Sequence, residues 1–89
     1  METQARIDTL KKHLKAIENI LHLNSEWNKT QQSIAKYTFC MAMLQTTDEI
    51  TYQVAAIAGR DVVVCLQDTI RILTESLAGP ATPDNIVEK

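Results

Sequence analysis

The sequence predicts an all-α fold: a single helical domain over residues 1–79, built as an antiparallel helical hairpin or three-helix unit that assembles into a dimeric helical bundle. Three observations predict it. No proline precedes Pro80 and Gly59 is the only glycine before Gly79, so the chain has few places to turn. Apolar residues recur with helical spacing along most of the chain. Apolar residues make up 45% of the chain but aromatic residues only 4%, which indicates an aliphatic core of helices packed side by side.

The first helix is expected over residues 3–23. Its apolar residues alternate at spacings of three and four, as in a coiled coil, and they are Ile7, Leu10, Leu14, Ile17 and Leu21. At 100° per residue they cover an arc of about 80°, which is a seam for one partner helix.

The second helix is expected over residues 26–45, with Trp27, Ile34, Tyr37, Met41 and Leu44 facing inward. Asn24 and Ser25 are good capping residues and favour a break before this helix. One continuous helix is the alternative, because the apolar rhythm continues through the join. Thr46 and Glu49 have the form of a capping box, which predicts a tight helical hairpin near residue 47.

The third helix is expected over residues 48–78. The run Val62–Val64 resembles a strand, but no second strand is available to pair with it, so the run is helical. Residues 61–77 are apolar over roughly 180°, more than the ~100° that a surface helix needs. Gly59 could end a helix and divide this segment. The small residues before it favour instead a helical glycine that lets another backbone approach.

The ends of the chain and its cysteines indicate the cellular compartment. Residues 80–89 follow a helix stop at Gly79–Pro80 and are expected to form a flexible tail. The N-terminus has no apolar signal-peptide region, and no stretch reaches the ~18 apolar residues of a membrane span. Cys40 and Cys65 lie in apolar runs and are expected to be reduced and buried, which favours a cytoplasmic location.

No catalytic residue, cofactor or metal site is expected. Glu18, His22 and Glu26 share a helix face, but this spacing is more typical of a solvated surface than of a metal site. In a continuous last helix, Cys65 would lie about 16 Å beyond the position opposite Cys40, too far for a disulfide.

The cations of the chain bear on two further kinds of partner, nucleic acid and a small dicarboxylate ligand. Lys11, Lys12 and Lys15 form a basic cluster without interleaved aromatic residues, so nucleic acid is not the expected partner. The stretch ARIDTL is similar to the start of all-helical chorismate mutases, which are about this length and hold a dicarboxylate with cations inside a bundle. That resemblance implies a cationic pocket. The inward positions of the first helix are apolar here, which leaves Lys29, Lys36 and Arg60 as its candidates.

The surplus of apolar surface on the last helix leads to the functional prediction. One hairpin can cover only one side of that helix, and large exposed apolar patches usually mark association sites. We therefore expect a small non-enzymatic interaction protein, a regulator, adaptor or chaperone-like subunit that acts as a homodimer. The alternatives are a subunit of a hetero-oligomeric complex, a nucleic-acid accessory protein and a mutase-like bundle. The expected interface residues are Val62, Val63, Leu66, Ile70 and Leu73 with Ile7, Leu10, Leu14, Ile17 and Leu21.

Overall fold

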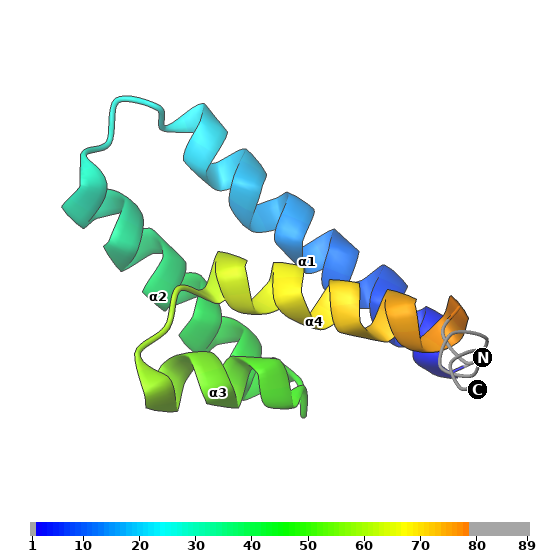
Figure 1. Cartoon of the computed structure of the whole chain (residues 1–89). Coiled ribbons are helices and arrows are strands. Elements are labelled where there is room, and N and C mark those ends of the chain that lie inside the picture. Colours follow the sequence, from blue (N-terminus) through cyan, green and yellow to red (C-terminus); the bar gives the residue numbers. More distant parts are fainter. Residues whose placement is uncertain (1, 79–89) are drawn as a thin grey trace, which may run out of the picture.

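The computed structural model describes residues 2–78. Over this range the chain forms four α-helices and no strand (Figure 1), namely α1 (Glu2–Leu23), α2 (Lys29–Thr46), α3 (Ile50–Ala58) and α4 (Val62–Ala78). The all-α class is therefore confirmed, with one helix more than the three predicted. The tail predicted at 80–89 lies outside the described residues.

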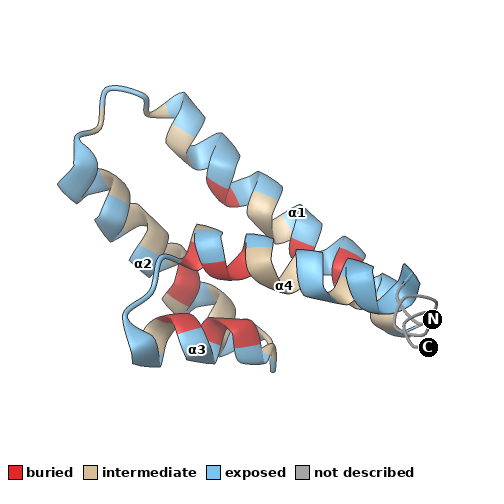
Figure 2. Cartoon of the chain, viewed as in Figure 1, coloured by how far each residue is buried: buried red, intermediate tan, exposed pale blue. Residues whose placement is uncertain are grey.

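Helix α4 is the central element of the bundle. It runs beside α1, and α2 and α3 also pack against it (Figure 1). The core lies where the four helices meet, as the buried positions in Figure 2 show. Its buried residues come from every helix and are Leu10, Ile17, Cys40, Tyr52, Ala55, Val62, Cys65 and Leu66. The expected aliphatic core therefore contains one aromatic residue, Tyr52, which is fully buried.

The predicted break between the first two helices is confirmed, but the second helix begins at Lys29 rather than near residue 26. Asn28 is its N-cap. The Asn28 side chain accepts a hydrogen bond from the Gln31 N–H at 2.9 Å, and the Gln31 side chain accepts one from the Asn28 N–H at 3.0 Å. This capping box holds the helix start. Trp27, expected inside the helix, consequently lies in the connection between α1 and α2.

The turn near residue 47 lies where the sequence predicted it, but the predicted capping box does not form. Thr46 is the last residue of α2, and Glu49 is itself the N-cap of α3. Its carboxylate accepts hydrogen bonds from the Thr51 N–H at 3.4 Å and from the Thr51 hydroxyl at 3.0 Å. The structure thus differs from the predicted capping box, because Glu49 lies before the helix as its N-cap and not in its first turn.

The prediction of one helix over 48–78 was wrong, because the chain turns at Gly59. Gly59 has a φ of +65°, and the N–H of the following Arg60 donates to the Ala55 carbonyl at 3.0 Å. This is a left-handed helix C-cap. Asp61 then caps α4, since its side chain accepts from the Val63 N–H at 2.9 Å. The turn sends α4 back through the bundle.

Replacing Gly59 by alanine tests this turn. No atom lies within 4 Å of a Cβ at this position, so the cost arises from the backbone conformation alone. We expect Gly59→Ala to lower the free energy of unfolding by about 1–2 kcal/mol in urea denaturation. Gly59→Asn, which tolerates this conformation better, should lose less. A continuous helix would instead gain about 1 kcal/mol from Gly59→Ala, so a stabilised variant would contradict the turn.

Candidate functional site

The ten residues predicted to form a partner interface pack within a single chain. Five are at most 3% exposed, and these are Ile7, Leu10, Ile17, Val62 and Leu66. The other five are partly buried, and these are Leu14, Leu21, Val63, Ile70 and Leu73. The seam on α1 thus meets α4 of its own chain. An interface between two chains made by these residues would require helices to exchange between chains, and it stays a prediction.

The turn at Gly59 explains why these ten residues can pack within one chain. A single hairpin would leave half of the last helix uncovered. Because the turn creates a separate α3, three helices surround α4 instead of one. An apolar arc of roughly 180° can therefore be buried largely inside one chain.

Open apolar surface is found elsewhere, between α1 and α2. A groove of about 510 Å³, which we call the α1–α2 groove, lies beside the connection of these helices. Its lining residues carry no charge, and they are Ile20, Trp27, Gln31, Ile34, Ala35, Thr38, Phe39 and Ala42. Ile20 is 38% exposed and Ile34 is 60% exposed. The groove thus presents apolar side chains to solvent from both helices.

One side of helix α2 is exposed, because only its other side packs against the core. Cys40 is the only buried residue among its 18. The prediction that Ile34 and Tyr37 face inward was wrong, since each is 60% exposed. At 100° per residue, the positions of Gln31, Ala35, Thr38 and Ala42 fall within an arc of about 60° that faces the groove. The helix therefore has an outward side that is uncharged and partly apolar.

A second open surface lies between α3 and α4. This pocket has a volume of about 350 Å³ and includes the apolar residues Ile50, Val54, Ile72 and Leu73. Unlike the α1–α2 groove, it also contains the charged side chains of Arg6, Arg60 and Asp68. A partner placed there would have to desolvate these charges.

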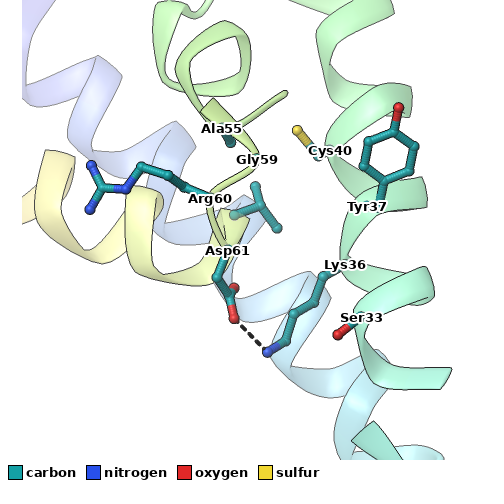
Figure 3. A pocket seen from close by; sticks show the side chains of 9 residues that line it. Ser33, Lys36, Tyr37, Cys40, Ala55, Gly59, Arg60 and Asp61 are labelled. Atoms are coloured by element: carbon teal, nitrogen blue, oxygen red, sulfur yellow. Dashed lines mark hydrogen bonds and ion pairs between the residues drawn. The ribbon is translucent and has the colours of Figure 1, made fainter. Parts of the chain in front are cut away.

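The cations that the mutase resemblance singled out do not form a cationic pocket. Lys36 and Arg60 line one cavity of about 270 Å³ near the start of α4, whereas Lys29 is not among its lining residues (Figure 3). Lys36 Nζ donates to the Asp61 carboxylate at 2.7 Å. The Arg60 guanidinium points away from Cys40 in Figure 3 and lies 3.8 Å from Asp68. The charges of Lys36 and Arg60 are thus matched by Asp61 and Asp68 of the same chain.

The Lys36–Asp61 ion pair also affects the capping of α4. Burial opposes ionisation of Asp61, but the hydrogen bonds from Lys36 and from the Val63 N–H outweigh it and lower the pKa of Asp61. The carboxylate is therefore charged over a wide pH range. It holds α2 and the first turn of α4 together.

The two cysteines come closer together than the sequence indicated. Cys40 and Cys65 belong to the same buried cluster, because the turn at Gly59 brings α4 back toward α2. The distance inferred from a continuous helix does not apply, because the segment is divided at Gly59, but the prediction of free, buried thiols is confirmed. Both are free thiols, and burial raises the pKa of each. Such thiols are poor nucleophiles, since the thiolate is the reactive form.

A polar contact joins α1 to the fully buried Tyr52. His13 Nδ1 lies 2.5 Å from the Tyr52 hydroxyl, and the His13 ring makes an edge contact with Phe39. Burial and the neighbouring Lys12 lower the pKa of His13, although Glu49 acts in the opposite direction. Burial also raises the pKa of Tyr52. The pair is therefore uncharged near neutral pH.

An ion pair lies at the same contact between α1 and α3. Arg6 donates from Nε to a Glu49 carboxylate oxygen at 2.7 Å and from Nη2 to the other oxygen. The hydrogen bond from Arg6 lowers the pKa of Glu49, with a further contribution from Thr51 against the effect of burial. The bidentate pair fixes α1 to the residue that caps α3.

The described residues give no direct indication of a cofactor, a metal or a membrane. Between residues 2 and 78, no group of three or more His, Cys, Asp or Glu side chains is placed to hold a metal ion. No helix in this range has the length and hydrophobicity needed to cross a bilayer. Comparisons with protein-family models, curated proteins and solved structures found no match to this chain. The candidate site is the α1–α2 groove, the open surface whose lining residues are uncharged and largely apolar.

Substituting Leu66 by aspartate tests whether the predicted interface belongs to the core. Leu66 is 0% exposed, so the carboxylate would be buried without a partner. We expect Leu66→Asp to unfold the chain, at a cost above about 4 kcal/mol, measured by loss of helical circular dichroism. Ile72→Asp is the matched control on the same helix, because Ile72 is 55% exposed. A folded monomer carrying Leu66→Asp would show that Leu66 is not a core residue.

The free energy of unfolding should fall as the pH drops below 6.5, the ordinary pKa of histidine. Because the pKa of His13 is lowered from 6.5 in the folded chain, the unfolded chain binds this proton more readily. The stability that depends on a neutral His13 is thus fully present above about pH 6.5, and it is lost as the pH falls below that value and through the lower pKa of the folded chain. Urea unfolding at pH values above and below this range should show the loss of stability, and His13→Gln should make that loss smaller. His22→Gln is the control. An unchanged pH dependence in His13→Gln would contradict the role given to His13.

Proposed function

We propose that the protein is a small non-enzymatic protein-interaction module, in the class of a regulator, adaptor or chaperone-like subunit, that acts through helix–helix contacts as a homodimer. The observation that supports this proposal is the α1–α2 groove, an open apolar surface whose lining residues are all uncharged. Apolar patches of this kind on soluble proteins usually mark association sites.

The composition of the groove suits a protein partner. Trp27 and Phe39 lie in it, and they are two of only four Phe, Tyr and Trp residues in the chain. Aromatic residues are enriched at the centres of protein interfaces, where they bury a large area at a small cost in conformational entropy. Walls from two helices would let an apolar helix pack against both.

A second copy of the chain is the simplest partner, because two-fold dimers are the commonest assemblies of soluble proteins. A hetero-oligomeric subunit would offer the same groove to a different chain. A nucleic-acid accessory protein would use the exposed residues Lys11, Lys12 and Lys15 of α1 instead. The free, buried thiols of Cys40 and Cys65 fit a reducing compartment, and we propose a cytoplasmic location on that basis.

Sedimentation equilibrium of the wild-type chain tests the homodimer. We expect the mass to rise from one chain to two as the concentration increases from low micromolar to near millimolar. Trp27 is the single tryptophan, so its fluorescence emission should move to shorter wavelength over the same range as the groove loses water. A monomeric mass with constant emission at every concentration would contradict the proposal. Binding to DNA or RNA that is lost on replacing Lys11, Lys12 and Lys15 would favour the accessory protein.

A further inference from the structure

The proposed homodimer could in principle use any open surface, and the residues of α2 select one. Resting on that proposed function, we infer that the second copy occupies the α1–α2 groove, with α2 packed antiparallel against α2 of the other chain across a two-fold axis near Thr38. Three properties of the α2 residues support this arrangement: their order along the helix, their size and their charge.

The order of residues on the outward side of α2 is the same in both directions. Gln, Ala, Thr, Ala and Gln follow one another at spacings of four, three, four and three, at Gln31, Ala35, Thr38, Ala42 and Gln45. A two-fold axis at Thr38 places Gln31 of one copy opposite Gln45 of the other, since each is seven residues from the centre. Ala35 and Ala42 then lie close to one another across the axis. This side of the helix is self-complementary.

The sizes of these side chains fit a close helix–helix contact. Ala35, Thr38 and Ala42 are small and allow two helix axes to approach, while the larger side chains of Ile34 and Phe39 flank them on either side. Large side chains of one helix can pack beside the small positions of the other. Ile20 of α1 and Trp27 form the remaining wall of the groove and would widen the contact beyond α2.

The charges also favour this surface for self-association. Two-fold pairing places the same surface of both copies face to face, so any net charge on that surface would meet an equal charge of the same sign. The lining of the α1–α2 groove carries no charge. Lys29 and Lys36 fall on the opposite side of α2 at 100° per residue, about 160° or more from Thr38. The α3–α4 pocket, by contrast, would have to desolvate Arg6, Arg60 and Asp68.

Two substitutions on α2 test the interface without disturbing the core. Ala42→Glu places two carboxylates near the proposed axis, and Ala42 is exposed in the single chain, so helical circular dichroism should remain. We expect the dimer dissociation constant to rise at least tenfold in sedimentation equilibrium. Ser33→Glu is the matched control, because Ser33 is also exposed and lies on the other side of α2, where it lines the Lys36 cavity.

Crosslinking locates the axis. Thr38→Cys should give a disulfide-linked dimer on treatment with diamide, since the two introduced thiols lie next to one another across the axis. Gln53→Cys on the exposed side of α3 is the control and should stay largely uncrosslinked. The wild-type chain gives the background from Cys40 and Cys65, which are buried.

The results of these experiments distinguish a failure of the proposed interface from a failure of the proposed homodimer. A wild-type dimer weakened by Ala42→Glu and linked through Thr38→Cys supports both. A wild-type dimer that survives Ala42→Glu and does not form the Thr38→Cys link overturns the interface and leaves the homodimer standing. A wild-type chain that is monomeric throughout overturns the homodimer and this interface together.

Discussion

Covering the apolar surface of α4 is the requirement on which the rest of the structure depends. Val62, Cys65 and Leu66 are buried near the start of this helix, and α1, α2 and α3 each supply part of their cover. The turn at Gly59 makes this possible, because it separates α3 from α4 and lets the two helices pack on one another. Without that turn, a single long helix would leave one side of its apolar surface in water.

The features that the sequence predicted correctly are those that depend on the local spacing of apolar residues. The spacing of Ile7, Leu10 and Ile17 correctly indicated the first helix, and their burial follows from that seam meeting α4. The prediction of a helical glycine at Gly59 was wrong, because the small residues before it are compatible with both a continuing helix and a helix end. The stronger signal was Asp61, two residues beyond the glycine and directly before an apolar run, which is the arrangement of an N-cap.

The candidate site could be predicted only in part, since exposure depends on which helices pack together. Periodicity shows that α2 has an apolar side but not whether that side faces the core. Ile34 belongs to the apolar series of the sequence, yet it is among the exposed residues of the groove. The apolar surplus was attributed to α4, whereas the fold buries much of α4 and leaves α2 with a single buried residue. The packing of the helices decides which apolar residues are buried and which are exposed, and the periodicity of the sequence does not encode that packing.

The ion pair between Lys36 and Asp61 joins α2 to the start of α4. Lys36 projects from the side opposite the α1–α2 groove and bonds to Asp61, the residue that caps the start of α4. A second copy in the groove, as proposed, would contact α2 on one side while Lys36 joins the other side of α2 to the start of α4. A ligand that binds only the folded chain raises the melting temperature by mass action, and for self-association the protein is its own ligand. Its heat resistance would then increase with its abundance.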